Sequence, residues 1–347
     1  MSNTCLLPVV IGGVLLLSAG ECSSQLAGLE CLTLADNAFA PAPVPVAFAK
    51  LTKLTYLWMS DMSIIGEIPE ALSSLTELTL LDRCNSGLGL ECLYLFNNSL
   101  TGELPRNVMT ENLIEIVLSM NQLRGEMSED FGNLRNLTLL SLYMNNLTGT
   151  IPASIGLLPK LSTIWLDNNN LFGELPPELG KHSPLSSIGI SNNNLSGPLP
   201  ETLCANGELY GIYASNNNFS RNLPANLGDC VLLQELVLDN NRFSGDFPEK
   251  IWLLPELEIV MIPNNNFTGV LPAMGNNMFS GSIPRTAISL RGFWAENNQL
   301  DGELPADMSK LANLTDLSVP DNHITGPIPA SIKLLLNLNS LNLSASK

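Results

Sequence analysis

The sequence predicts an α/β solenoid in which short parallel strands form a sheet on a concave face, and short 3-10 and loop segments form the convex side. Two observations predict this fold. The phrase L-x-x-L-x-L-x-x-N-x-L-x-G-x-[I/L]-P recurs about every 24 residues from Asn37 to the C-terminus. A single copy is too short to bury its own apolar edges, so it is stable only when stacked on its neighbours.

The repeat is counted through its asparagine, called the anchor here. Of fifteen anchor positions, twelve are asparagine, and the seven steps from Asn98 to Asn265 each measure 23 or 24 residues. This regularity predicts an array of about 14 repeats over residues 25–347. The anchors are Asn37, Met62, Ser86, Asn98, Asn121, Asn145, Asn169, Asn193, Asn217, Asn241, Asn265, Asn277, Asn298, Asn322 and Ser346.

The chemistry of one repeat explains its pattern. Leu140 and Leu142 alternate with residues that a strand would point to the concave face. The chain then turns sharply, and the amide of the anchor Asn145 offers hydrogen bonds to backbone groups that the turn would bury. Gly149 suits a tight backbone position, and Pro152 suits a fixed extended one.

A period of about 20 to 29 residues with this leucine spacing is the signature of leucine-rich repeats. The I/L-P ending resembles the plant-specific class, and the stretches 192–206 and 240–252 resemble the ectodomains of HAESA-like receptor kinases. This resemblance implies a cell-surface receptor that captures a secreted peptide along its concave face, with a co-receptor kinase. The ending recurs at Pro69, Pro105, Pro152, Pro176, Pro200, Pro224, Pro248, Pro272, Pro284, Pro305 and Pro329.

Composition is compatible with a long continuous core outside the cytosol. Hydrophobic residues make up 45% of the chain and charged residues only 14%, and the mean hydropathy is +0.19. The formal net charge of −17 disfavours nucleic acid and anionic membrane surfaces as partners. We therefore expect no nucleic-acid partner.

The N-terminus carries a mostly apolar run from Cys5 to Leu17, followed by Ser18, Ala19 and Gly20. The run is too short to span a membrane and has the length of a signal-peptide core. It predicts a signal peptide within residues 1–24 and an extracellular protein with no membrane span in this chain. The alternative is a remnant spliced onto the array, because no Lys or Arg precedes the run.

Eight N-x-S/T sequons are candidate glycosylation sites. An asparagine-rich repeat followed by Leu-Thr or Leu-Ser produces such sequons automatically, so each one is weak evidence by itself. We expect several of them to carry glycans if the chain is secreted. They begin at Asn97, Asn136, Asn146, Asn194, Asn218, Asn266, Asn313 and Asn342.

The seven cysteines do not form a regular framework. Cys204 and Cys230 fall in neighbouring repeats, but their offsets from the preceding prolines differ by two residues. The sequence therefore favours buried free thiols at these positions. No Cys or His spacing suits a metal, and we expect neither a metal nor another cofactor.

Two anchor steps measure only 12 residues and predict half-length repeats near 86–98 and 265–277. The plant class normally opens with a cap that holds a cysteine pair beside a tryptophan, and no such segment precedes Leu26. No C-terminal cap, membrane span or kinase segment precedes Lys347 either. These departures favour a fragment or a degenerate paralogue of a longer receptor.

Catalytic motifs are weak. Asp130-Phe131-Gly132 matches the magnesium-binding tripeptide of kinases, but the glycine-rich loop, the lysine strand and the H-R-D loop are missing. The only histidines, His182 and His323, have no nucleophile partner in a recognisable motif. We expect no enzyme.

The concave face carries the most informative residues. Each anchor defines three outward positions, six, four and two residues before it. Seven of the nine Tyr and Trp residues of the chain fall on these positions, and exposed aromatic residues favour peptide or protein recognition. Stacking between neighbouring strands is the alternative explanation. The predicted ligand-binding residues are Tyr56, Trp58, Tyr94, Phe96, Tyr143, Trp165, Asp167, Tyr213, Asp239, Trp294 and Glu296.

The same positions hold seven acidic residues and no Lys or Arg, which favours a basic ligand. In relatives that sense peptides with a free C-terminus, an Arg-x-Arg pair six and four residues before an anchor clamps the carboxylate. No anchor of this chain has that pair. The acidic residues are Asp82, Glu115, Asp167, Glu235, Asp239, Glu296 and Asp316.

The sequence thus predicts an extracellular module that binds a secreted peptide or protein and that is derived from a plant receptor. One alternative is a secreted inhibitor of microbial cell-wall hydrolases, similar to polygalacturonase-inhibiting proteins. The other is a receptor fragment without function.

Overall fold

The computed structural model describes residues 28–37, 40–74, 91–105, 112–269, 289–309 and 311–344. The chain divides into two compact parts, Met1–Leu171 and Phe172–Lys347, called the N-terminal part and the C-terminal part below. Each part is a stack of coils, with one repeat per coil. The predicted signal peptide within residues 1–24 lies outside the described residues.

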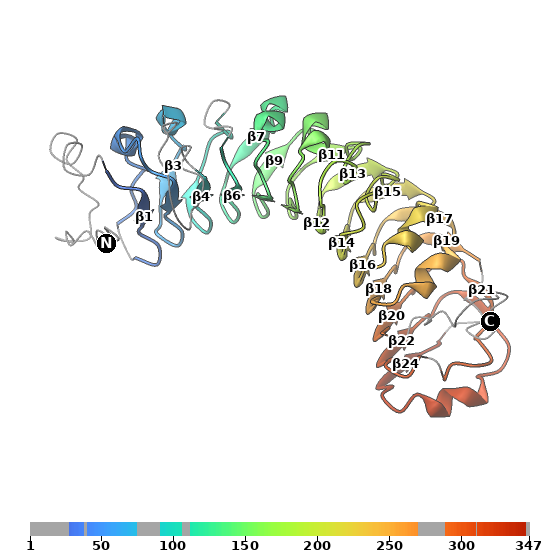
Figure 1. The fold of residues 1–347 in the computed structure, drawn as a ribbon. Coiled ribbons are helices and arrows are strands. Elements are labelled where there is room, and N and C mark those ends of the chain that lie inside the picture. The colour runs from blue at the N-terminus through green and yellow to red at the C-terminus, as the bar shows by residue number, and fades with distance from the viewer. Residues whose placement is uncertain are drawn as a thin grey trace. The chain divides into compact units, whose positions relative to one another are not determined.

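In the N-terminal part, every coil contributes one three-residue strand to a parallel sheet in the order β1-β2-β4-β6-β8-β10 (Figure 1). Neighbouring strands pair without a shift in register, as Leu139 with Thr163 shows. The strands are β1 (Cys31–Thr33), β2 (Tyr56–Trp58), β4 (Cys92–Tyr94), β6 (Glu115–Val117), β8 (Leu139–Ser141) and β10 (Thr163–Trp165).

The other side of these coils carries short strand pairs and 3-10 helices, which Figure 1 shows along the edge opposite the sheet. The pairs are β3 (Ile65–Gly66) with β5 (Ser99–Leu100), and β7 (Arg124–Glu126) with β9 (Asn146–Thr148). The 3-10 helices are η1 (Val46–Lys50), η2 (Glu70–Ser74), η3 (Glu129–Asn133) and η4 (Ala153–Leu157). Asp130-Phe131-Gly132 lies within η3, where Phe131 is 2% exposed and belongs to the core.

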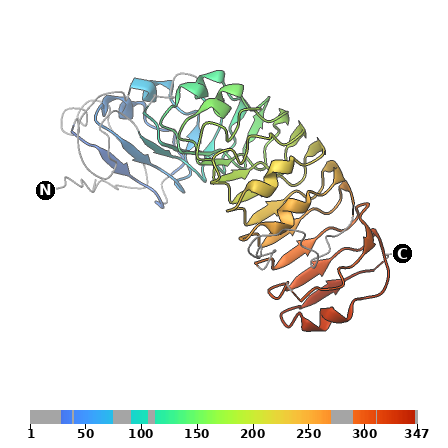
Figure 2. The same cartoon turned by 45° about the vertical axis from the view of Figure 1, so that its right-hand side comes forward.

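The C-terminal part repeats this plan, and its strands stack in parallel in Figure 2. Its parallel sheet has the order β12-β14-β16-β18-β20-β22-β24. The strands are β12 (Ser187–Gly189), β14 (Gly211–Tyr213), β16 (Glu235–Val237), β18 (Ile259–Met261), β20 (Gly292–Trp294), β22 (Asp316–Ser318) and β24 (Ser340–Asn342).

The C-terminal part has a second parallel sheet with the order β11-β13-β15-β17-β19, and each of its strands begins shortly after an anchor asparagine in the sequence. Further along the chain, β21 pairs with β23. These strands are β11 (Phe172–Gly173), β13 (Asn194–Gly197), β15 (Asn218–Arg221), β17 (Arg242–Asp246), β19 (Asn266–Thr268), β21 (Asp301–Glu303) and β23 (His323–Thr325). The 3-10 helices are η5 (Ala225–Asp229), η6 (Glu249–Leu253) and η7 (Ala330–Leu334).

The core of each part is a column of apolar side chains stacked from coil to coil. Leu140 and Leu142 are both 0% exposed, as their alternation predicted. In the C-terminal part, phenylalanine replaces the leucine two residues after three successive anchors. The rings of Phe219, Phe243 and Phe267 stack nearly parallel, with centroids 5.9 and 6.0 Å apart. Large contact area between neighbouring coils stabilises the stack.

The asparagine ladder has the role that the sequence predicted. The Nδ2 of Asn145 donates to the carbonyl oxygen of Leu142 in its own coil and to that of Leu118 in the preceding coil, both at 3.0 Å. Its Oδ1 accepts from the backbone N–H of Leu123 at 3.0 Å. The buried amide thus satisfies backbone groups of two coils at once, and Asn169, Asn217, Asn241 and Asn265 make equivalent bonds.

The two predicted half-length repeats, near 86–98 and 265–277, fall partly outside the described residues, which lack 86–90 and 270–277, so this division stays a prediction. On either side of the first, β2 pairs directly with β4, and β18 pairs directly with β20 near the second. The Oδ1 of Asn98 accepts from the backbone N–H of Met62 at 3.1 Å. The ladder therefore passes from Asn98 straight to Met62.

The prediction of free thiols at Cys204 and Cys230 was wrong, because the two residues form a disulfide with Cα atoms 5.5 Å apart. The two coils differ in local structure. Cys204 lies in a run of turns, in which its carbonyl oxygen accepts from the N–H of Gly207, whereas Cys230 is the C-cap of η5. The number of residues between the proline and the cysteine therefore does not predict where the sulfur atom lies in the coil.

Candidate ligand-binding face

The candidate site is the solvent-facing side of the two parallel sheets, called the sheet face here and considered separately in each part. It consists of the residues six, four and two positions before each anchor. All eleven predicted binding residues are described and partly exposed. In the strands of this face from β2 to β10 and from β12 to β22, the middle residue is buried, as in β10, where Ile164 is buried between Thr163 and Trp165. The predicted alternation of inward and outward side chains along these strands is therefore confirmed.

The N-terminal part gathers three of the predicted aromatic residues into one cluster. The rings of Tyr56 and Tyr94 meet edge to face with centroids 5.4 Å apart, and Trp58 meets both, at 6.4 and 6.2 Å. The register explains the cluster, since Tyr56 and Trp58 share β2 and Trp58 pairs with Tyr94 on β4. Edge-to-face packing holds the rings in place. The stacking alternative thus applies here, although every ring remains partly exposed.

Polar groups edge this cluster. The hydroxyl of Tyr94 donates to Oε2 of Glu115 on β6. Burial, and after it the hydrogen bond to Glu115, raises the pKa of Tyr94 well above its usual range. The indole N–H of Trp58 and the hydroxyl of Ser60 are buried without a hydrogen-bond partner among the described residues.

The other predicted residues of this part lie further along the sheet. Phe96 follows β4, Tyr143 follows β8, and Trp165 and Asp167 belong to the β10 coil. The side chains beside them on the sheet face are small and polar. The hydroxyls of Ser119 and Ser141, for example, are 2.7 Å apart. Tyr143, Trp165 and Asp167 therefore lie in later coils than the ring cluster of β2 and β4.

In the C-terminal part, two aromatic rings lie close over glycines of their own strands. A Cβ at Gly211 would be 2.8 Å from Cε2 of Tyr213, and one at Gly292 would be 2.2 Å from Cη2 and Cζ3 of Trp294. Sequence reasoning missed these glycines. The signal was present as Gly-x-Tyr and Gly-x-Trp, with the glycine two residues before the ring.

Three of the four carboxylates on the sheet face of the C-terminal part are satisfied by neighbouring side chains. Tyr213 is hydrogen-bonded to Glu235, and the pKa of Tyr213 is raised, first by burial and then by this bond. Asp239 accepts from Ser215 and Asn240, and Asp316 accepts from Thr315. Oε2 of the fourth, Glu296, is buried without a hydrogen-bond partner among the described residues.

The described positions of the sheet face hold no Lys or Arg in either part. No pair of opposite charges therefore neutralises its carboxylates within that face. Such a surface attracts positively charged groups and repels negatively charged ones.

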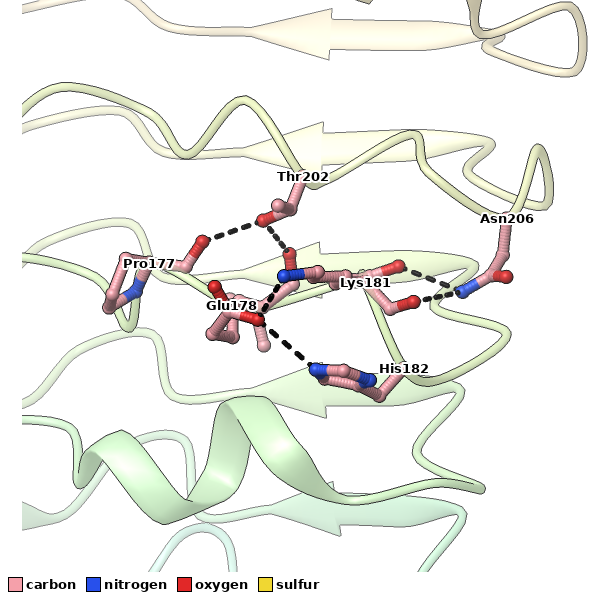
Figure 3. A network of polar contacts seen from close by, with 8 residues as sticks. Pro177, Glu178, Lys181, His182, Thr202 and Asn206 are labelled. Atoms are coloured by element: carbon pink, nitrogen blue, oxygen red, sulfur yellow. Dashed lines mark hydrogen bonds and ion pairs between the residues drawn. The ribbon is translucent and has the colours of Figure 1, made fainter.

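A polar network on the other side of the C-terminal part links neighbouring turns (Figure 3). Glu178 accepts from Lys181 at 2.6 Å and lies 3.1 Å from Nε2 of His182; these contacts, Lys181 first, lower the pKa of Glu178. Nδ2 of Asn206 donates to the carbonyl oxygens of Gly180, Lys181 and Ser183. The network joins two coils, and the described residues hold no cluster of three or more His, Cys, Asp or Glu suited to a metal.

All eight predicted glycosylation sites are at least partly exposed. Asn136 accepts a hydrogen bond from Lys160, and Asn218 donates to Asn194. Asn136 and Asn218 are the less exposed ones. The exposed ones are Asn97, Asn146, Asn194, Asn266, Asn313 and Asn342.

Comparison with known families identifies the coil. The profile of the Leucine Rich Repeat family matches residues 53–75, 89–110, 136–158, 160–182, 184–206 and 232–254. In these six segments the coil has the sequence of a leucine-rich repeat. Among curated proteins, Receptor-like protein 52 of Arabidopsis thaliana is 36% identical over 92 residues, which are 23% of this chain and 11% of that protein.

Solved structures support the plant-receptor resemblance. The leucine-rich-repeat ectodomain of the Arabidopsis receptor kinase HAESA, in complex with an N-terminally extended IDA peptide hormone, matches with a TM-score of 0.79 and 33% identity. The match covers 92% of this chain and 55% of that one. HAESA in complex with IDA and the co-receptor SERK1 matches with a TM-score of 0.72 and 34% identity, over 91% of this chain and 57% of that one.

The resemblance to HAESA-like ectodomains predicted from the sequence is thus confirmed at the level of fold and sequence similarity. The chain spans just over half the length of the HAESA ectodomain and about a tenth of Receptor-like protein 52. Within its described residues, no helix has the length and apolarity needed to cross a bilayer.

Proposed function

We propose that this chain is the extracellular, ligand-binding part of a plant cell-surface receptor system, and that it captures a secreted peptide or protein on its sheet face. The observation that carries the proposal is the composition of that face. It presents partly exposed aromatic rings and carboxylates and, among its described positions, no basic side chain. Aromatic residues provide large contact area at small entropic cost.

The ligand carries basic side chains, since a sheet face with carboxylates and without Lys or Arg favours them. A co-receptor kinase completes the signalling complex, by analogy with the HAESA complex that contains SERK1. A role in signalling or in defence follows from such a receptor.

The chain is a secreted glycoprotein at the cell surface. The disulfide between Cys204 and Cys230 supports an oxidising compartment, and the exposure of six sequon asparagines leaves them accessible to glycosylation. Secretion from plant cells, followed by a mass decrease on peptide-N-glycosidase treatment, tests this part. Retention of an unmodified chain in the cytosol would contradict it.

The ligand proposal is tested with a random library of 12-residue peptides displayed on messenger RNA and selected on the secreted protein. We expect the binding free energy of selected peptides to be weaker by about 2 kcal/mol or more in Trp165→Ala than in wild type, which is the cost typical of losing a buried aromatic anchor. Phe172→Ala is the matched control, because Phe172 is 46% exposed on β11 and lies outside the sheet face.

Peptides that bind wild type and Trp165→Ala equally would remove Trp165 from the site. If Trp58→Ala and Trp294→Ala also left binding unchanged, the sheet face would not be the binding surface. Inhibition of polygalacturonase at sub-micromolar concentration, measured on the same preparation, would favour the inhibitor alternative.

A further inference from the structure

Glu296 differs from the other carboxylates on the sheet face of the C-terminal part. Its Oε2 atom is buried and has no hydrogen-bond partner among the described residues, whereas Glu235, Asp239 and Asp316 are each bonded to a neighbouring side chain. A carboxylate oxygen removed from water without a partner is costly. The side chain of Glu296 is partly exposed, so rotation of its carboxylate would bring this oxygen to the surface, where a donor from outside the protein would recover that cost.

Such a donor cannot come from a basic residue of the same face, because its described positions carry none. Arg291 immediately precedes β20, but its side chain is 65% exposed and its Nε pairs with Glu258 at 3.4 Å. The partner of Glu296 is therefore expected to be a cation of the ligand.

Trp294 supplies a surface for the same cation. It lies two residues before Glu296 and on the same side of the sheet. Its ring covers Gly292, since Cη2 and Cζ3 lie 2.2 Å from where a Cβ of Gly292 would be. The six-membered edge of the indole thus lies over Gly292 on β20. The side chain is partly exposed.

The register defines the two sides of this indole. Trp294 pairs with Met261 on β18 and with Ser318 on β22, while Gly292 pairs with Asp316. An apolar side chain thus borders the ring on one side and a second carboxylate on the other. A flat cation placed on the indole would meet π electrons below and carboxylates at its edge.

We propose that Trp294 and Glu296 form a subsite for a guanidinium, the side chain of an arginine in the ligand. Arginine fits better than lysine because its planar group stacks on an indole while its N–H groups reach a carboxylate in a forked arrangement. The subsite rests on the proposed function and deepens it by naming one side chain of the ligand and the place where that side chain binds.

The test uses the full chain with 5-fluorotryptophan in place of tryptophan, which gives four ¹⁹F resonances for the four Trp residues. Trp294→Phe assigns the resonance of Trp294. Nα-acetyl-arginine amide should shift that resonance saturably. Nα-acetyl-citrulline amide, nearly the same shape without the charge, should bind about fivefold more weakly or not at all.

Glu296→Gln should weaken the arginine response by about fivefold or more, because it removes a charge-assisted hydrogen bond. Glu249→Gln is the matched control, since Glu249 lies on η6 and outside the sheet face, and its response should equal that of wild type. Equal shifts by arginine and citrulline, or an unchanged response in Glu296→Gln, would overturn the subsite.

The subsite and the proposed function fail in different ways. Selected peptides that bind the sheet face while the arginine probe leaves the Trp294 resonance unmoved would reject the subsite alone. An arginine response lost in Glu296→Gln, together with a library that yields no binders, would support the subsite and reject peptide capture.

Discussion

Arg221 occupies the backbone position that glycine holds in the neighbouring coils. Pro198, in the coil before Arg221, occupies the position that Glu174 holds one coil earlier, next to Gly197. Arg221 has a φ of 72°, close to the 77° of Gly197 and the 74° of Gly245. A Cβ at Gly197 would lie 2.6 Å from Cγ of Glu174 in the coil before. Pro198, which replaces that glutamate one coil later, has a shorter side chain. Both exceptional residues line a hollow of about 860 Å³.

The first prediction concerns the cost of this exchange. A non-glycine residue in the left-handed region costs about 1–2 kcal/mol of folding free energy. Replacing Arg221 with glycine removes this cost, but glycine has more conformational freedom in the unfolded chain, which offsets about 0.5–1 kcal/mol of the gain. Arg221→Gly should therefore stabilise the chain by about 0.5–1 kcal/mol, measured as a rise in the urea midpoint. Gly197→Arg, the reverse exchange one coil earlier, should destabilise it because Glu174 fills the space.

A double-mutant cycle tests the pairing itself. Pro198→Glu alone should destabilise the chain, because the new side chain meets the Cβ of Arg221. Pro198→Glu with Arg221→Gly should remove most of that loss, since the pair then matches Glu174 and Gly197. Strictly additive effects would show that the two positions do not interact.

The second prediction concerns the asparagine ladder. Asn145→Ala removes four hydrogen bonds to backbone groups of two coils and leaves buried polar groups unsatisfied, each at about 1–3 kcal/mol. We expect a loss of about 3 kcal/mol in the free energy of unfolding. Asn170→Ala, an exposed asparagine in the next coil, should change it by less than about 0.5 kcal/mol. Similar losses in both variants would refute the role of the ladder.

The third prediction concerns the disulfide. Cys204 and Cys230 are 26 residues apart, and a cross-link that closes a loop of this size stabilises a protein by about 3 kcal/mol, mainly by restricting the unfolded chain. Replacing both cysteines with serine should lower the unfolding free energy by about that amount. Cys31→Ser, at an exposed free thiol, should have almost no effect. Peptide mapping under non-reducing conditions must also recover the 204–230 pair.

The sequence predicted features that depend on chemistry within one repeat. The anchor amide, the inward leucines and the positive φ of Gly149 follow from local groups that must be satisfied. It failed where two coils differ locally. The turns after Pro200 and the helix η5 after Pro224 bring two sulfurs together in spite of unequal offsets.

On the sheet face, the sequence placed each aromatic residue on the correct side. It could not show which rings meet, because that depends on neighbours in adjacent strands. Tyr56, Trp58 and Tyr94 form a cluster because β2 pairs directly with β4. Trp294 covers Gly292 because position 292 has no Cβ, and the ring occupies the space that a Cβ would need. The unpartnered oxygen of Glu296 depends on side-chain packing that no repeat pattern encodes.

The last prediction uses the tyrosine at the edge of the aromatic cluster. Burial, and then the hydrogen bond to Glu115, raises the pKa of Tyr94 above the ordinary tyrosine value of about 10. The folded protein therefore keeps a proton that the unfolded chain loses. The stability that this provides is fully present below about pH 10 and is lost as the pH rises above it. In Tyr94→Phe, the urea midpoint should fall less steeply between about pH 10 and 11 than in wild type. Glu115→Gln should keep a slope steeper than that of Tyr94→Phe, because burial, the largest cause, still raises the pKa of Tyr94. Identical slopes in the three proteins would show that Tyr94 ionises alike in the folded and unfolded states.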